Sequence, residues 1–320
     1  MNKIWSLGIA NVDIVTQPIT RWPVFGGAVS SDTTELVLGG MALNTAVSIA
    51  KIGKVPVGLI SCISHDICGE IVEKGLGDLN VDISHMCYTD QANTGNAICF
   101  IHPGGERSFV LCMAANNYLN ANNIDFNALQ EGDFLHVGGA MIMDGTRGED
   151  LAKILRKAKT RKVTISLDTC WDGTEQWTKI LAPCLPYVDI FETNKEEAML
   201  YAGKDTLEKA LEFYSSFNIP IIVVKMGDKG VYIKSESFTG NVSIFPVEAV
   251  DATGAGDAFD AGFLIGLIND WPIEQAAILG SAVGAKCVTA YGATTGIVSY
   301  EETLEIIKAA NRQGSWSWEL

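Results

Sequence analysis

The sequence predicts an α/β fold in which helices cover both faces of a mainly parallel sheet. From the middle of the chain onward, short apolar runs rich in β-branched residues alternate with stretches such as 149–159 and 207–217, which carry Leu and Ala at helical spacing. This alternation is typical of βαβ units, whose active sites lie at the carboxyl ends of the strands. The strands expected on this basis span 133–137, 163–167, 188–191 and 219–225.

Two segments, 12–37 and 88–113, do not follow the alternation. They contain alternating or β-branched stretches that are broken by Pro, Gly and Asn, and they have no helical period. Within the second segment, 94–102 and 107–112 flank a loop that contains Pro and Gly. We therefore expect these two stretches to pair as a β-hairpin.

Length, charge and hydropathy limit the classes of protein that the chain can be. With 320 residues, of which 48% are hydrophobic, it can bury a sizeable core as one large α/β domain or two smaller ones. The net charge of −15, with no block of Lys or Arg to offset it, argues against nucleic acid as a partner. No apolar segment is long enough to span a bilayer, and we expect the short apolar run at 4–10 to be a first buried strand rather than a signal peptide.

The eight cysteines include no Cys-x-x-Cys pair, and the four histidines are scattered along the chain. This distribution argues against a zinc site and favours buried free thiols in a reducing compartment. A cytoplasmic location is therefore the expectation.

The run 251–259, DATGAGDAF, has the composition of a phosphate site. Gly254, Ala255 and Gly256 allow backbone N–H groups to converge on an anion, and a helix expected to begin near residue 255 adds its N-terminal dipole. Asp257 is either a residue that complements this dipole or a base that takes a proton from a hydroxyl attacking a phosphate. The chain contains no P-loop sequence, and the run lacks the third glycine of a dinucleotide fingerprint.

This run resembles the second signature of the PfkB (ribokinase-like) carbohydrate kinase family, except that Ala252 replaces the family's Thr. Residues 38–53, LGGMALNTAVSIAKIG, resemble the first signature, a diglycine followed by Asn and a helix rich in small residues. Met41 stands where ribokinase proper has Lys, which argues against ribose as the substrate. The resemblance covers essentially the whole chain and implies one kinase domain over 1–320.

The resemblance implies a three-layer α/β/α sandwich with a small β-sheet lid, built from 12–37 and 88–113, that closes over the substrate and forms a homodimer contact. It also implies ATP and Mg²⁺ and, as in some relatives, K⁺. Asp257 would be the base, with Gly254, Ala255 and Gly256 in the anion hole. The residues that would bind the sugar are Asn11, Asp13, Gly39, Gly40 and Asn44.

For the nucleotide and metal side, two interpretations remain open at each motif. Asn194 and Glu197 are either a helix cap with a capping-box-like partner or the family's water-mediated magnesium ligands. The loop that follows Lys225 is either a plain hairpin turn or the family's nucleotide-binding loop. Asp251 either orients the anion-hole loop or borders a monovalent-cation site. The residues that the resemblance assigns to the nucleotide are Lys225, Gly227, Gly230 and Gly292.

The sequence is thus interpreted as that of an ATP-dependent kinase that phosphorylates a hydroxyl of a small sugar or sugar derivative. A nucleoside kinase of the same fold is the alternative within this class. A sugar or nucleotide sensor without catalytic activity is the alternative from another class, although the intact run around Asp257 argues against it.

Overall fold

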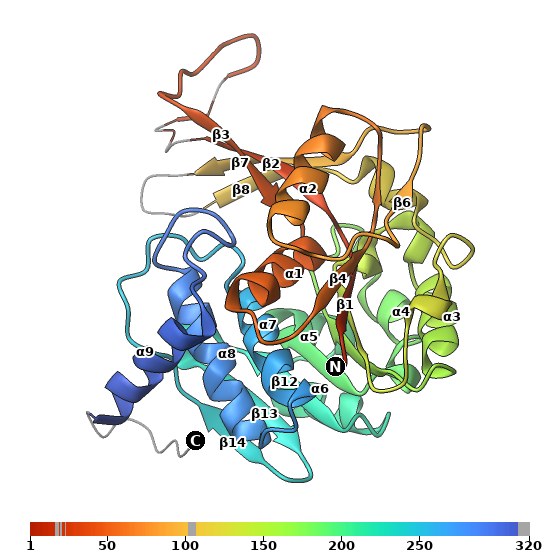
Figure 1. Cartoon of the computed structure of the whole chain (residues 1–320), viewed down its shortest axis with the longest axis vertical. Helices are drawn as coiled ribbons and strands as arrows, with labels where there is room; N and C mark the ends of the chain where they lie inside the picture. The colour runs from red at the N-terminus through yellow and green to blue at the C-terminus, as the bar shows by residue number, and fades with distance from the viewer. Residues whose placement is uncertain (17–18, 20, 23, 102–106, 313–320) are drawn as a thin grey trace.

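The core of the protein is an eight-stranded sheet, seen here in a computed structural model that describes the chain except residues 17–18, 20, 23, 102–106 and 313–320 (Figure 1). Its strand order is β14-β13-β12-β11-β10-β9-β1-β4, and every pairing from β4 to β12 is parallel. β13 and β14 extend the sheet antiparallel. The strands are β1 (Ile4–Gly8), β4 (Val57–Ile60), β9 (Phe134–Gly138), β10 (Thr164–Asp168), β11 (Ile190–Asn194), β12 (Ile221–Lys225), β13 (Val231–Ser235) and β14 (Thr239–Val242).

Two layers of helices enclose this sheet, so the predicted α/β fold with a mainly parallel sheet is confirmed. Both faces of the inner strands are buried, which explains why β1 and β9 are continuous apolar runs apart from Ser6 and His136. One layer comprises α1 (Met41–Ile52), α7 (Ala255–Ile268), α8 (Ile273–Cys287) and α9 (Tyr300–Arg312). The other comprises α3 (Glu149–Lys159), α4 (Trp177–Leu181), α5 (Lys195–Ala202) and α6 (Leu207–Ser215).

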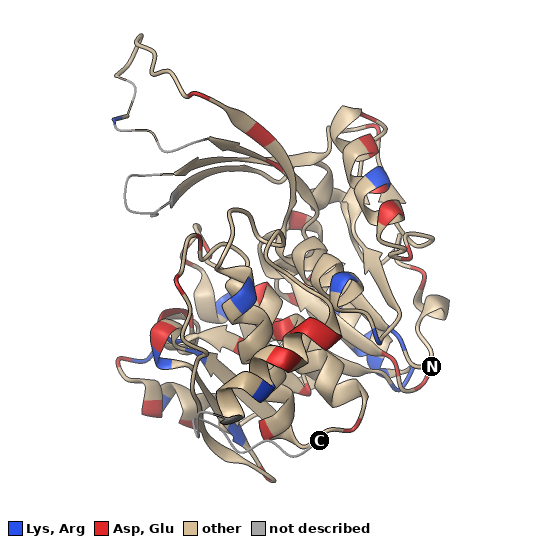
Figure 2. Ribbon diagram, turned by 60° about the vertical axis from the view of Figure 1, so that its left-hand side comes forward, with Lys and Arg blue, Asp and Glu red and all other residues tan. Residues whose placement is uncertain are grey.

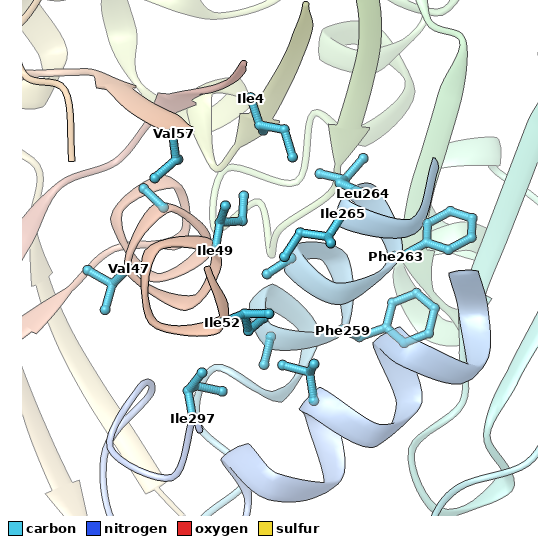
Figure 3. Packing of buried hydrophobic residues seen from close by; sticks show 14 of the residues in the cluster. Ile4, Val47, Ile49, Ile52, Val57, Phe259, Phe263, Leu264, Ile265 and Ile297 are labelled. Atoms are coloured by element: carbon cyan, nitrogen blue, oxygen red, sulfur yellow. The ribbon is translucent and has the colours of Figure 1, made fainter. Parts of the chain in front are cut away.

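The first helical layer packs through aliphatic and aromatic side chains. Ile49 and Ile52 of α1 lie toward α7, where Phe259 and Ile265 are buried (Figure 3). This packing holds the start of α1 and the start of α7 beside each other, and both starts carry predicted site residues.

A separate four-stranded sheet, of order β3-β2-β7-β8, projects from the body as the lid (Figures 1 and 2). The expected hairpin is confirmed, because β7 and β8 pair antiparallel; its loop lies outside the described residues. α2 (Ile67–Asp78) packs against β2 and β3. The strands of this sheet are β2 (Asn11–Thr16), β3 (Thr34–Gly39), β7 (Gly95–Ile101) and β8 (Arg107–Cys112). A further, two-stranded sheet pairs β5 (Cys62–Ile63) with β6 (Cys87–Tyr88).

Short 3₁₀ turns complete the connections. They span Ala114–Tyr118, Phe126–Ala128, Ala140–Ile142, Asp144–Thr146, Leu185–Tyr187 and Gly227–Lys229. Acidic positions are spread over both the body and the lid (Figure 2), in line with the net charge of −15. None of the described helices combines the length and the apolar character that crossing a membrane requires.

Candidate active site

The carboxyl edge of the main sheet brings together residues from strands that are far apart in sequence. β10 ends at Asp168, β11 at Asn194 and β12 at Lys225, and parallel pairing aligns these ends. β9, β10 and β11 end one to three residues beyond the ends expected from the sequence. β12 ends at Lys225, as predicted. Asn11 follows β1 at the same edge. A site at the carboxyl ends of the strands is therefore present, as the fold class predicts.

The loop that precedes α7 has a backbone suited to binding an anion. Gly254, the N-cap residue, has φ of 73°, and a Cβ atom there would lie 2.6 Å from the Cβ of Ala293. α7 begins at Ala255, as predicted from the sequence. The Ala255 amide makes a long 3.3 Å bond to the Ala252 carbonyl, whereas the amides of Gly256 and Asp257 donate to no described residue. Two N–H groups at the positive end of a helix are thus available to a phosphate.

Asp251 fixes the shape of this loop. Its Oδ1 accepts hydrogen bonds from the Thr253 amide at 2.8 Å and the Thr253 hydroxyl at 2.6 Å, and its Oδ2 accepts one from the Gly292 amide at 2.8 Å. The carboxylate therefore joins the anion loop to the segment that contains Gly292. This geometry supports the loop-orienting interpretation of Asp251.

Asp257 is a buried carboxyl with only 7% of its surface exposed. The side-chain amide of Asn44, at the start of α1, donates to Asp257 Oδ2 at 2.8 Å. Burial raises the pKa of Asp257 to about 7; the nearby Asp168 adds to this rise, while the Asn44 bond and the Lys225 charge oppose it. A carboxyl with such a pKa can accept a proton near neutral pH and return it.

Lys225 lies beneath the anion loop in a cluster of acids that sequence reasoning missed. Its Nζ lies 2.8 Å from Asp168 Oδ1 and 3.0 Å from both carboxylate oxygens of Asp260. Oxygens of Asp168, Asp257 and Asp260 lie within 4.8 Å of one another. Although burial disfavours the ammonium, the carboxylates of Asp168, Asp260 and Glu192 keep the pKa of Lys225 above its usual range.

Two signals in the sequence could have identified the acids of this cluster. Asp168 directly follows the strand expected at 163–167, and Asp260 lies three residues after Asp257 on one helix. The structure pairs the Lys225 ammonium with these acids and positions it 3.3 Å from where a Cβ of Gly256 would lie. Gly227 and Gly230 lie in the turn between the antiparallel strands β12 and β13, so the loop is a hairpin turn, and its assignment to the nucleotide stays a prediction.

Asn194 and Glu197 form a cap at the start of α5. Asn194 Oδ1 accepts a hydrogen bond from the Glu197 amide at 2.8 Å, which is the capping geometry predicted as one alternative. Glu197 is buried, and its Oε2 accepts a hydrogen bond from the Thr169 hydroxyl at 2.6 Å. Burial raises the pKa of Glu197. The Asn194 side chain also contributes a hydrogen bond to this carboxylate, which has further lone pairs to accept one from a metal-bound water.

Asn11 and Asp13 lie on one face of β2, two residues apart. Asn11 pairs with Gly39 on one side and Gly95 on the other, so small residues flank it on both neighbouring strands. Burial raises the pKa of Asp13 to about 6, and its Oδ1 is buried without a hydrogen-bond partner among the described residues.

The first signature completes this side of the site. Gly40 caps the N-terminus of α1, from which Asn44 projects toward Asp257. The Oδ1 of Asn44 is buried and has no partner among the described residues. Orphaned buried acceptors on Asp13 and Asn44 indicate a ligand that donates hydrogen bonds, such as a hydroxyl compound.

The fold and this site are those of a kinase that acts on a small hydroxyl compound. The chain belongs to the pfkB family of carbohydrate kinases, whose model matches residues 1–299. It is 27% identical to a ribokinase of Haemophilus influenzae, over 95% of this chain and 98% of that protein. It is 26% identical to a fructokinase of Vibrio alginolyticus, over 96% and 99%. A structure of Arabidopsis thaliana ribokinase with ribose and ATP superimposes with a TM-score of 0.80 at 23% identity, covering 96% of this chain and 98% of that one.

Proposed function

We propose that the protein transfers the γ-phosphoryl group of ATP to a hydroxyl of a small sugar or sugar derivative, with Asp257 as the general base. The observation that carries this proposal is the position of Asp257, a buried carboxyl with a pKa of about 7 in the same helical turn as the free amides of the anion loop. The hydroxyl proton passes to Asp257 as the hydroxyl oxygen forms a bond to phosphorus. The bond from phosphorus to the β,γ-bridging oxygen breaks, and ADP leaves.

The anion loop supplies the second part of the chemistry. Negative charge on the transferred phosphoryl group would face the Gly256 and Asp257 amides, which are fixed in place by the Asp251 hydrogen bonds. Donors that are already oriented stabilise a transition state more than flexible donors do, because they need no reorganisation. Lys225 lies below the same loop and keeps the acids around Asp257 from accumulating uncompensated charge.

The donor set fits Mg²⁺ bound with its waters. Glu197 offers a carboxylate at the edge where the phosphates would lie, and Mg²⁺ prefers oxygen ligands and keeps several waters. When bound with ATP, the ion would neutralise phosphate charge. The Asn194 side-chain oxygen is engaged in the helix cap, so its role would be to hold Glu197 in place.

A sugar panel tests the proposal. Thermal shifts are measured with sugars, sugar acids and nucleosides in the presence of an ATP analogue, since a ligand of the native state raises the apparent stability. Compounds that bind are then assayed for ADP release with MgATP. A phosphorylated sugar confirmed by mass spectrometry supports the proposal, whereas preferred turnover of a nucleoside would support the alternative. Binding without turnover of any compound would indicate a sensor.

Replacing Glu197 by Gln should raise the Mg²⁺ concentration needed for half-maximal activity and leave sugar affinity nearly unchanged. The amide is weaker as an acceptor for metal-bound water, but it keeps the size of the side chain and an oxygen for Thr169. Glu196→Gln is the matched control, because Glu196 is in the same helical turn and exposed. Superimposable Mg²⁺ titrations of the wild type and Glu197→Gln would leave Asn194 and Glu197 with a capping role alone.

The lid also supports the proposed homodimer. Phe109, Val110 and Leu111 of β8 are exposed by 45%, 57% and 54%, and Leu36 of β3 is exposed by 57%. Light scattering should give the mass of a dimer for the wild type and a smaller mass for Val110→Asp, since a charge in an apolar contact is costly. Val247→Asp, on the body, is the control. A monomeric wild type at assay concentration would contradict the dimer.

A further inference from the structure

A buried asparagine outside the predicted site contacts the side chain of Asn11. Asn116 lies in the 3₁₀ turn Ala114–Tyr118 and is fully buried. Its Oδ1 accepts a hydrogen bond from the Ala10 amide at 2.9 Å. Its Nδ2 donates to the carbonyl oxygens of Ala10 at 3.1 Å and Met113 at 3.0 Å. A main-chain N–H can only donate and a carbonyl can only accept, so these three contacts fix the orientation of the Asn116 amide.

That orientation determines the orientation of the next side chain. Asn116 Nδ2 also lies 2.9 Å from Asn11 Oδ1, its third acceptor, so one of its two hydrogens is shared between acceptors. The oxygen of Asn11 therefore has to face Asn116, because the reverse orientation would set two NH₂ groups against each other. The NH₂ group of Asn11 then faces away from Asn116, and it donates to no residue in the part of the chain that the structure describes.

The strand next to Asn11 is built to allow this contact. Gly95 of β7 pairs with Asn11, and a Cβ on Gly95 would lie 2.2 Å from both Asn11 Oδ1 and Asn116 Nδ2. Any side chain at position 95 would push the two amides apart. The contact between the two amides therefore requires glycine at position 95, whereas pairing of the hairpin strands does not.

We infer that Asn116 is a positioning residue that presents Asn11 to the acceptor pocket as a hydrogen-bond donor, next to Asp13 as a hydrogen-bond acceptor. This inference rests on the proposed function and adds to it the pattern of hydrogen-bond donors and acceptors that the substrate must have. The substrate must offer an acceptor oxygen at Asn11 and a hydroxyl hydrogen at Asp13. A ligand that can only donate at the first position, or only accept at the second, leaves a buried polar group unpaired and is rejected.

The substitution Asn11→Asp tests which group of the Asn11 side chain faces the ligand. The variant keeps the oxygen that faces Asn116 and replaces the outward NH₂ by an oxygen. The KM for the sugar should rise by ~10-fold or more, the result of an unpaired buried contact, with folding intact and the KM for ATP unchanged. Asn96→Asp is the matched control, because Asn96 pairs with Val12 and lies on the other face of the lid sheet. An Asn11→Asp variant that is unstable but binds sugar normally would overturn the inference.

Positioning by Asn116 is tested with a double-mutant cycle on Asn11→Ala and Asn116→Ala, using D-ribose and D-fructose as probes with MgATP. If Asn116 acts through Asn11, the double variant has the sugar KM of Asn11→Ala, while losses of thermal stability still add. Independent, additive effects on the sugar KM would overturn the inference. Gly95→Ala, compared with Gly77→Ala in α2, gives the same test without removing a polar group.

A measurement without sugar keeps this inference separate from the proposed function. In ¹⁵N NMR spectra of the free protein, the Asn11 side-chain NH₂, assigned by its loss in Asn11→Asp, should exchange rapidly with water. The Asn116 NH₂ should be protected. A protected Asn11 NH₂ would overturn the inference even if the sugar is phosphorylated. Rapid exchange with no turnover of any panel compound would leave the orientation of Asn11 supported and the proposed function rejected.

Discussion

Replacing Asp257 by Asn should lower kcat by ~10²-fold or more, the usual range for loss of a general base, while ATP and sugar still bind. The amide has the shape of the carboxylate but cannot take the hydroxyl proton. Asn44 can still contact the remaining side-chain oxygen at this position, so the loop should keep its structure. Calorimetry of ligand binding with single-turnover kinetics separates binding from chemistry.

The pH dependence provides a second measurement of the same role. Because the pKa of Asp257 is about 7, kcat/KM of the wild type should fall as pH decreases below about 7, where the base becomes protonated. The residual activity of Asp257→Asn should lack this acid limb. Turnover within a few-fold of the wild type, or an unchanged acid limb in the variant, would show that Asp257 is not the base.

Replacing Asp13 by Ala should weaken sugar binding by roughly 1–3 kcal/mol, the cost of leaving buried polar partners unpaired. Its Oδ1 has no hydrogen-bond partner among the described residues, so a ligand hydroxyl would be its partner. ATP affinity should hardly change, since the anion loop is built from a different part of the chain. Calorimetry with each ligand tests both statements. An equal loss for ATP, or unchanged sugar affinity, would make Asp13 a structural residue.

Asp13→Asn should in contrast raise the Tm of the ligand-free protein. Burial raises the pKa of Asp13 from 3.8 to about 6, so the folded state binds a proton more tightly than the unfolded state does. Stability therefore falls as pH rises through this range, and the full penalty of the buried charge is present above pH 6. The neutral amide removes the penalty. The gain in Tm should be full above pH 6 and shrink as pH approaches 4; a gain that is independent of pH would contradict this cause.

Local patterns in the sequence were sufficient to predict most of the fold. The start of α7 at Ala255, the bounds of α3 and the β7–β8 hairpin follow from glycine positions and side-chain periodicity, which act over a few residues. The strand expected at 188–191 instead forms at Ile190–Asn194, after a 3₁₀ turn over Leu185–Tyr187. Its apolar composition was correct, but strand ends depend on pairing with β10 and β12, which local sequence does not encode.

By itself, the sequence determined the fold class, the family and the short motifs that supply an anion loop and its carboxylate. Only the tertiary structure decided which side chains meet. Asn44 and Asp257 are separated by 213 positions, and Asn11 and Asn116 by 105, yet each pair shares a hydrogen bond. The Lys225 ammonium likewise meets Asp168 and Asp260 only because β10, β12 and α7 end or begin at one edge of the sheet. The pKa of Asp257 and the polarity of Asn11 depend on burial and partners, which exist only once these distant elements have packed.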